Sequence, residues 1–425
     1  MKGWVYDLYI QPSYYFTFYG FEWVEPLGEF GMYALFTLLA ITALGVMFGA
    51  FYRLSIVLFF LAFTYVELID KTNYLNHYYF VSIVSFLMIL VPAHRYFSFD
   101  VWRKPDLKTT QVPAWCINII KFQLAVVYFY AGLAKLNPDW LFNAMPLKIW
   151  LPANAHLPVI GGLLEMEITA YIFSWSGAIY DLFVPFFLLY NRTRVWAYGA
   201  VIGFHLMTSL LFQIGMFPYI MILSTLIFFS PTFHEQLITQ VRRLFGSSSY
   251  DSASTLKYRL NSKATSFMMT GLAVYVALQI LLPFRYALYP GNLYWTEQGY
   301  RFSWRVMLME KAGYAIFHIT DPETGRSWEA SNWEYLTPVQ EKMMATQPDM
   351  ILQFAHHLEE EYQKQGINDV EVRAEVYATL NGRRSRLLVD SDQDLTKVKP
   401  GLGHKDWILP YSSDQEIKLH TSNTP

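Results

Sequence analysis

A single lysine, Lys135, lies near the end of a long apolar and aromatic segment, residues 114–136. Helix geometry must break just beyond it, at Asn137-Pro138. An ionisable residue inside a membrane-type helix is costly, which makes it a candidate for function. Burial in an apolar site favours the neutral amine, which can accept a proton. Alternatively, the side chain extends to the membrane surface and only anchors the helix. Position alone leaves both interpretations open.

Other ionisable residues could assist such a base. His77 begins an apolar segment at the same end of the protein as the lysine, and Asn76 precedes it. A lone histidine at a membrane surface is more often structural, and Asn76 is typical of a turn. His205 lies within an apolar segment, where a hydrogen bond to a neighbouring helix is the simpler explanation. Glu67 and Asp181 are acids within apolar segments and could be paired packing groups rather than catalysts.

Composition and motifs exclude several classes of protein. The chain is 54% hydrophobic, 18% aromatic and only 16% charged, which indicates a membrane protein. A net charge of −2 gives no electrostatic case for binding nucleic acid. One cysteine, Cys116, allows neither an internal disulfide nor a paired-cysteine metal site, and we predict no metal. Walker, GxGxxG, HExxH and GxSxG motifs do not occur in a supporting context.

Eight apolar segments predict the elements that must position these residues. They are 32–51, 54–69, 78–93, 114–136, 168–190, 195–213, 219–230 and 267–284. Such segments predict a polytopic, all-α membrane bundle of about eight spans, which makes the bilayer a partner of this chain. Residues 1–31 are aromatic and mixed, and we expect an interfacial segment there. The predicted division is therefore 1–31, a transmembrane catalytic domain at 32–284, and residues 285–425.

Basic residues are unevenly distributed over the predicted loops. Twelve Lys and Arg residues lie on one side of the bundle, in the loops that contain Arg53, residues 94–112, Arg192 with Arg194, and residues 231–265. The two loops on the other side, 70–77 and 137–166, carry only two. Because cytoplasmic loops are enriched in Lys and Arg, we expect the end with Lys135 and both termini to be non-cytosolic.

Residues 285–425 predict a small extracytoplasmic α+β domain with a β-sheet. Residues 313–330 have the pattern of strand, turn and strand. Residues 370–390 alternate around Asn381-Gly382, which is a strong hairpin signal. Between them, residues 348–365 predict a helix that begins at Pro348-Asp349 and ends at Gly366.

Four stretches together resemble the vitamin K-dependent γ-glutamyl carboxylase family. They are DKTNYLNHYY (70–79), YFYAGLAKLNPDW (128–140), residues 204–223 with Gly215-Met216-Phe217, and YLTP (335–338). The similarity runs from about residue 30 to about residue 410. It implies an integral, multi-pass membrane enzyme, in a bacterial inner membrane or the endoplasmic reticulum.

The resemblance implies a reaction and roles for individual residues. Vitamin K hydroquinone reacts with O2 to give the epoxide, and the base so formed lets CO2 add to glutamate in a protein or peptide. Lys135 matches the family's base that activates the hydroquinone, and His77 and Asn76 match residues that assist it. His205, Met216, Phe217, Tyr335 and Leu336 become candidates for binding quinone or substrate.

The chain also departs from the animal carboxylases. It lacks their disulfide, their additional upstream segment and their long C-terminal region, so we expect a shorter, bacterial-type member. Two alternatives stay open. One is a quinol oxidase or epoxidase that does not carboxylate. The other is a membrane binding or transport protein that uses the same scaffold without catalysis.

Overall fold

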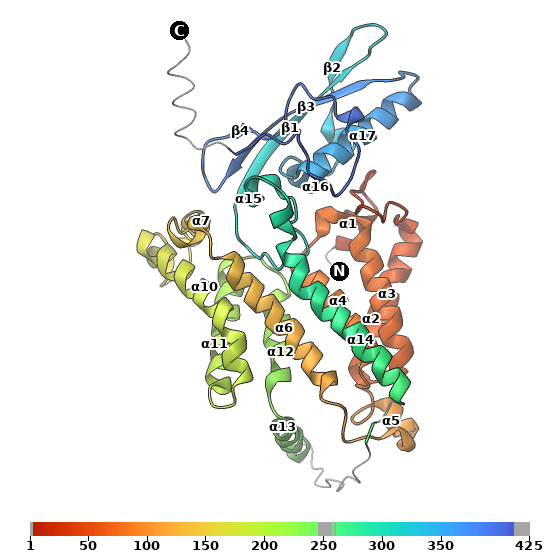
Figure 1. Cartoon of the computed structure of the whole chain (residues 1–425), viewed down its shortest axis with the longest axis vertical. Coiled ribbons are helices and arrows are strands. Elements are labelled where there is room, and N and C mark those ends of the chain that lie inside the picture. Colours follow the sequence, from red (N-terminus) through yellow and green to blue (C-terminus); the bar gives the residue numbers. More distant parts are fainter. Residues whose placement is uncertain (1–2, 245–256, 259–260, 412–425) are drawn as a thin grey trace.

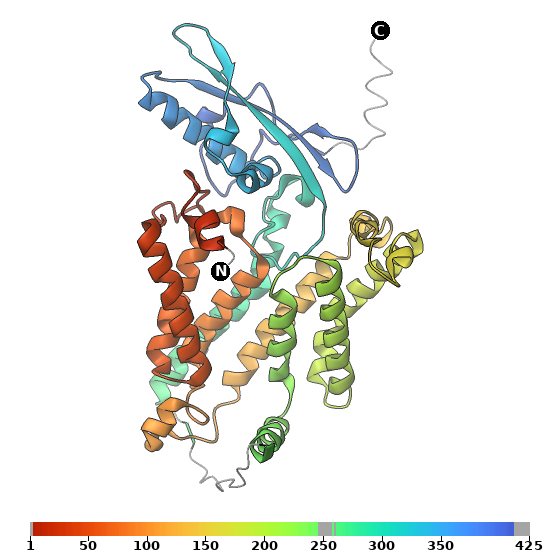
Figure 2. The ribbon, with the colours of Figure 1, turned by 180° about the vertical axis from the view of Figure 1, so that it is seen from behind.

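The computed structural model describes residues 3–244, 257–258 and 261–411. A body of long helices forms one part of the molecule, and a sheet with its own helices lies over one end of that body (Figure 1). Residues 289–411, which carry this sheet, are called the cap below. The same arrangement is seen from behind in Figure 2, with the two parts joined along one boundary.

In the described part of the chain, the helical body contains eight largely apolar helices. These are α2 (Gly28–Phe48), α3 (Tyr52–Ile69), α4 (Asn76–Leu90), α6 (Trp115–Ala134), α10 (Glu167–Leu189), α11 (Arg194–Leu211), α12 (Phe217–Thr225) and α14 (Ser262–Leu281), which continues as η5 (Leu282–Leu288). Short helices connect them: α1 (Trp4–Tyr9), α5 (Phe99–Arg103), α7 (Pro138–Leu141), α8 (Leu147–Trp150), α9 (Gly161–Leu164) and α13 (Pro231–Leu244). Single 3-10 turns occur at η1 (Lys71–Asn73), η2 (Pro105–Leu107), η3 (Pro152–Asn154) and η4 (Leu226–Phe228).

The protein is a multi-pass membrane protein. Among the described residues, five helices are long and apolar enough to cross a membrane: α2, α3, α6, α10 and the continuous 262–288. The number rises to six if residues 217–228 and 231–241, which meet at 113°, form one broken span. The predicted polytopic bundle is confirmed, and each of the eight predicted segments coincides with a helix in the described chain.

Helices α4, α11 and α12 do not reach the length or hydropathy of a separate span. Helix α12 is short because it starts only at Phe217-Pro218, beyond a break that includes Gly215 in the left-handed region (φ 62°). Residues 231–265, expected to be a polar loop, begin instead with α13, which has proline at its first position. By length and hydropathy, the described residues thus contain five or six candidate spans, which is roughly consistent with the predicted count of about eight.

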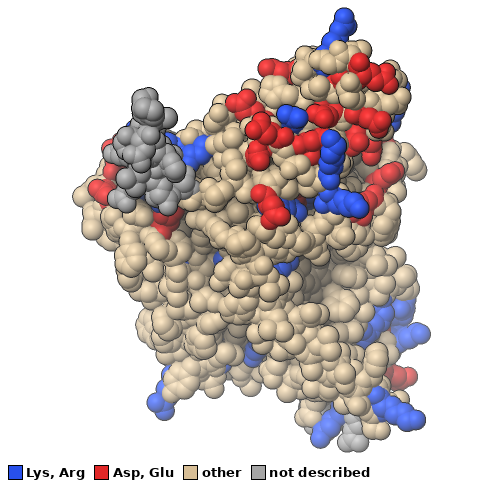
Figure 3. Space-filling view, turned by 45° about the horizontal axis from the view of Figure 1, so that its top comes forward, with Lys and Arg blue, Asp and Glu red and all other residues tan. Residues whose placement is uncertain are grey.

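Charge separates the two ends of the molecule. Lys and Arg side chains predominate at the end of the helical body away from the sheet, whereas the cap carries many acidic side chains with basic ones among them (Figure 3). Between them lies a belt with few charges. This distribution is the one that a bilayer-spanning body with a polar cap requires.

The cap is an α+β unit with its own core, as predicted. Its strands are β1 (Lys311–Thr320), β2 (Ser327–Glu329), β3 (Glu371–Leu380) and β4 (Arg386–Leu387), in the antiparallel order β2-β1-β3-β4. Helices α15 (Leu293–Thr296), α16 (Pro338–Met344) and α17 (Pro348–Lys364) and the turns η6 (Asn332–Glu334) and η7 (Leu395–Lys397) complete it. Helix α17 buries one face against the strands, where Phe354 packs edge to face on Phe317 at 5.0 Å.

Part of the N-terminal segment belongs to the core of the cap. Phe16 is fully buried there. Tyr14 stacks on His357 at 4.1 Å between ring centroids, and its backbone oxygen accepts a hydrogen bond from Gln340 Nε2 at 2.7 Å. Residues 13–17 therefore connect the helical body to the cap.

The loop at residues 70–76, between α3 and α4, binds the cap through polar contacts. Asp70 Oδ2 accepts a hydrogen bond from Gln340 Nε2 at 2.9 Å. Lys71 Nζ lies 2.9 Å from Asp349 Oδ2, which also accepts from Arg301 at 2.7 Å. The DKTNYLNH stretch, singled out from the sequence, therefore holds the cap against the helical body.

Replacing Asp349 with asparagine should destabilise the protein by about 2 kcal/mol, because Lys71 and Arg301 lose a shared charged partner. Burial favours the neutral acid, but Arg301 and Lys71 outweigh it and hold the pKa of Asp349 well below its usual range. Its stabilisation is then present above the unfolded pKa of about 4 and is lost as the pH falls. Thermal unfolding should show that the difference in stability between wild type and variant becomes smaller at acidic pH.

Asp369→Asn is the matched control, because Asp369 is exposed and sits at a left-handed φ of 53° that asparagine tolerates. An equal loss of stability in both variants would contradict the role given to the Asp349 contacts.

Candidate active site

Lys135 lies at the C-terminal end of α6, and its side chain is buried and does not extend into solvent. Asn137 begins α7 by accepting a hydrogen bond from Trp140 N at 3.0 Å, and its Nδ2 donates to Ala134 O at 2.9 Å. Tyr294 of the cap donates to the same carbonyl at 3.0 Å. These bonds satisfy backbone groups that the end of α6 would leave unpaired, and they fix the direction of Lys135.

Helices α6 and α10 approach closely at Gly132, three residues before the lysine. A Cβ on Gly132 would lie 2.4 Å from the backbone nitrogen of Leu182. Only glycine permits this distance, as in the small-residue contacts of membrane helices. The close approach brings Asp181, the neighbour of Leu182, beside Lys135.

Lys135 and Asp181 form a buried ion pair. The Lys135 Nζ lies 2.7 Å from Asp181 Oδ2 and 3.3 Å from Ala131 O, and it lies 5.3 Å from the Trp140 ring. The two residues are each only 5% exposed. The sequence leaves the partner of this lysine open, and the structure places beside it a carboxylate of α10 from 46 residues further along the chain. A paired charge costs far less to bury than a single one.

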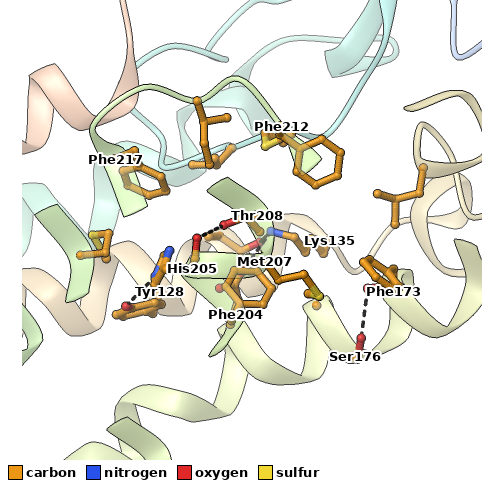
Figure 4. A pocket seen from close by; sticks show the side chains of 18 of the residues that line it. Tyr128, Lys135, Phe173, Ser176, Phe204, His205, Met207, Thr208, Phe212 and Phe217 are labelled. Carbon is orange, nitrogen blue, oxygen red and sulfur yellow. Dashed lines mark hydrogen bonds and ion pairs between the residues drawn. The ribbon is translucent and has the colours of Figure 1, made fainter. Parts of the chain in front are cut away.

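The pair lies in the wall of a small apolar cavity of about 80 Å³. That is enough for several water-sized groups. The walls come from α6, α10 and α11, from the α11–α12 connection, and from Val306 and Met307 of the cap (Figure 4). Phe173, Phe204, Phe212 and Phe217 supply aromatic surface. Such a space suits a flat apolar ring.

His205 faces the same cavity from α11. It is 2% exposed, and its Nε2 lies 3.0 Å from the Tyr128 hydroxyl. Its Nδ1 is buried without a hydrogen-bond partner. Figure 4 shows the ring between Tyr128 on one side and Phe217 on the other. A buried unpartnered nitrogen is costly, so Nδ1 is available to a polar atom of a ligand.

His77 and Asn76 lie behind the cavity wall. The His77 ring is 5.6 Å from the ring of Phe217, which lines the cavity. Asn76 Nδ2 donates to the Arg305 carbonyl at 2.7 Å, directly before the lining residue Val306. Both therefore contact residues that line the cavity, and neither lines it.

The remaining candidates from the sequence are divided between two places. Phe217 lines the cavity, whereas the adjacent Met216 is 63% exposed. Leu336 is buried in the core of the cap. Tyr335 packs against that core, and its carbonyl accepts a hydrogen bond from Ser13 at 2.9 Å. The structure therefore brings Lys135, His205 and Phe217 together, and it keeps Met216, Tyr335 and Leu336 outside this group.

Three lining residues had no assigned role from the sequence. From the sequence, Asp181 is only an acid within an apolar segment, and Tyr128 and Trp140 are only the first and last residues of the stretch 128–140. An acid in one span and a lysine in another can form an ion pair, and this was the one feature of the sequence that could have pointed to Asp181. Nothing local in the sequence says which acid and which lysine meet.

The cap also holds the loop that follows Lys135. Arg383 donates to both carboxylate oxygens of Asp139, with one distance of 2.7 Å, and Asn381 Nδ2 donates at 2.8 Å. Burial opposes the charge on Asp139, but these bonds outweigh it and lower the pKa of the carboxyl group. The hairpin tip of the cap thus fixes the position of Trp140, one residue further on.

Comparison with known families gives two matches. The family model described as "HTTM domain" matches residues 1–233, which include Lys135, Asp181 and His205. The model described as "Vitamin K-dependent gamma-carboxylase, lumenal domain" matches residues 264–414, which include the cap. No solved structure matches the chain.

Replacing Gly132 with alanine should force α6 and α10 apart, because the new methyl group would meet backbone rather than a movable side chain. We expect a loss of about 1–3 kcal/mol of stability from this overpacking. Thermal unfolding of the purified protein measures it. The matched control is Gly199→Ala in α11, where a Cβ meets nothing within 4 Å. A control that is destabilised as much as the test variant would exclude close helix packing as the cause.

Removing only one charge of the buried pair should be worse than removing both. Lys135→Met leaves Asp181 buried without a partner and should cost about 3–5 kcal/mol. The double variant Lys135→Met, Asp181→Leu should regain most of that stability. Unfolding of wild type, both single variants and the double variant completes the cycle. Additive losses would show that the two side chains do not interact.

Proposed function

This chain belongs to the vitamin K-dependent γ-carboxylase family, and from that premise we propose that it uses reduced vitamin K to carboxylate glutamate. In full, the proposed enzyme oxidises vitamin K hydroquinone with O2 to the epoxide and converts peptide glutamate to γ-carboxyglutamate with CO2. The observation that carries the proposal is the buried Lys135–Asp181 pair, which shares an apolar cavity with an unpartnered His205 nitrogen.

Lys135 is proposed as the proton acceptor. The pair has no net charge whether its proton makes an ammonium with a carboxylate or an amine with a carboxylic acid. The second arrangement leaves an amine that accepts a proton at Nζ from a hydroxyl group placed in the cavity. Asp181 then acts as a positioning residue, because its carboxyl group holds the nitrogen at 2.7 Å.

The cavity residues fit a reduced quinone. His205 Nδ1 needs a polar partner, and the aromatic walls accommodate a ring. When bound, reduced vitamin K supplies the electrons for O2 reduction and the strong base that lets CO2 replace a γ-proton of glutamate. His205 would orient a ring oxygen, and Tyr128 would hold the imidazole in position through its 3.0 Å contact. Phe217 would contact the ring.

Water must be kept away from such a base. Val306 and Met307 of the cap close the cavity on one side. Asn76 fixes the backbone before them, and His77 packs on Phe217. We propose Asn76 and His77 as positioning residues for this wall. Met216 is an exposed residue of the connection between α11 and α12.

The peptide substrate is proposed to approach from the cap side. The charge distribution supports a non-cytosolic cap, because charged residues at the opposite end of the helical body are mainly basic (Figure 3). Residues 1–31, 32–284 and 285–425 then form an interfacial segment, a catalytic domain and an extracytoplasmic domain. Tyr335 and Leu336 would act on substrate binding indirectly, through the cap core and its contact with residues 13–17.

The test is incorporation of labelled CO2 into a glutamate-containing peptide with reduced vitamin K. Lys135→Met should lower kcat by about 10²–10⁴-fold, which is the usual contribution of a general base. Lys121→Met is the matched control, because Lys121 lies fourteen residues earlier on the same helix and away from the cavity. It should retain activity.

Equal activity in Lys135→Met and wild type would overturn the role of the lysine. Formation of epoxide without labelled peptide would identify an epoxidase instead of a carboxylase. Absence of any O2 uptake with quinol would favour a binding or transport protein.

A further inference from the structure

A second, larger cavity of about 480 Å³ lies at the boundary between the helical body and the cap. It is lined by the N-terminal segment at residues 17–22, the ends of α3 and α14, the start of α17, and residues 400–405. None of the residues that line the first cavity lines this one. It therefore needs an explanation of its own.

The acids in this cavity already have partners among the described residues. Asp349 is bound by Lys71 and Arg301, and Glu297 is bound by Lys311 at 3.0 Å. Glu22 accepts a hydrogen bond from Gly20 N at 2.8 Å. The negative charges of Asp349 and Glu297 are therefore largely neutralised, whereas the carboxylate of Glu22 is exposed.

Two cations in the cavity have no carboxylate partner in the described chain. Arg285 donates to the backbone carbonyl of Arg301, and Lys405 donates to the backbone carbonyl of Gly401 at 2.9 Å. Burial lowers the pKa of Lys405, although the charge of Asp349 opposes this. An anion between these groups would offset the cost of burying them.

Gln298 supplies an independent sign of a ligand. It is 7% exposed and lines the cavity. Its Oε1 accepts from Lys405 N at 3.2 Å and contacts His404 Nδ1 at 3.2 Å. Its Nε2 is buried without a partner. A donor in this state, in a cavity that two cations also line, fits an acceptor oxygen of an anionic ligand.

The other walls are apolar and lie where the helices leave the membrane. Leu68 is one residue from the end of α3, and Leu282 follows α14 directly. Phe18, Phe21 and Leu402 extend this surface, and the last two are exposed at 40% and 71%. A ligand that fits the whole cavity has an anionic head and an apolar body.

We propose that this cavity binds the headgroup of an anionic phospholipid, with its phosphate near Arg285, Lys405 and Gln298. The acyl chains would follow the apolar wall at Leu68 and Leu282 into the membrane. A short acidic peptide matches the cations but leaves the apolar wall unused, so the lipid is favoured. Such a lipid would join the N-terminal segment, the helical body and the cap at a single site.

The experiment uses the full chain in detergent with phosphatidylglycerol or phosphatidylcholine of identical acyl chains, and native mass spectrometry counts the retained lipid. We expect at least about fivefold more phosphatidylglycerol than phosphatidylcholine on wild type. Lys405→Gln and Arg285→Gln should each lower that retention by about fivefold. Lys399→Gln is the matched control, because Lys399 is exposed and absent from the cavity wall.

Melting temperatures confirm that each variant is folded, and two different variants are used so that one unfolded protein does not decide the result. Folded variants that retain phosphatidylglycerol like wild type would overturn the proposal. So would equal retention of both lipids by wild type. Displacement of the lipid by inorganic phosphate alone, or by a glutamate-containing peptide, would assign the cavity to those ligands instead.

Discussion

The buried pair of Lys135 and Asp181 is the constraint on which the site depends. Neither charge could remain in an apolar wall alone, because the cost of removing a single ion from water is several kcal/mol. Two helices must therefore meet at one point and in one register. Gly132 permits the approach, and the capping bonds of Asn137 and Tyr294 fix the end of α6. The position of one nitrogen thus depends on three parts of the chain.

The cap contributes to this position as much as the helices do. Its hairpin tip holds Asp139, and its segment at 305–307 closes the cavity. The 70–76 loop, in turn, holds the cap through Asp70 and Lys71. A motif that would be assigned to chemistry from its polar residues is, in large part, the joint between two domains. Polar residues at a membrane boundary can serve both chemistry and domain attachment. They are shielded from water, which strengthens their hydrogen bonds, and they lie close to the site.

Two cavities of different character lie near the same boundary. The first is small and aromatic, with one paired amine and one unpartnered imidazole nitrogen. The second is larger, and two of the cations that line it have no carboxylate partner among the described residues. One suits a ring that must be kept from water, and the other suits an anion with an apolar body. Their separation would allow the proposed lipid to bind at the boundary without entering the proposed reaction site.

The sequence by itself determined the elements whose signals are local. Apolar runs indicated membrane helices, Asn381-Gly382 indicated a hairpin, and Pro348 and Gly366 marked a helix that the structure places at Pro348–Lys364. Lys135 stood out because a charge in an apolar segment needs no distant information to be noticed. These features follow from hydrophobicity, backbone sterics and charge over a few residues.

The tertiary structure alone decided which distant residues meet. It paired Lys135 with Asp181, placed His77 behind Phe217, and buried Phe16 in the cap. It also showed that α12 is too short for a separate span and that residues 231–244 form a helix. Contacts across tens or hundreds of residues depend on how whole helices pack, and close approach at a single glycine is not encoded in any local periodicity. For that reason Asp181 could be recognised in the sequence as an acid within an apolar segment, but it could not be identified as the partner of Lys135.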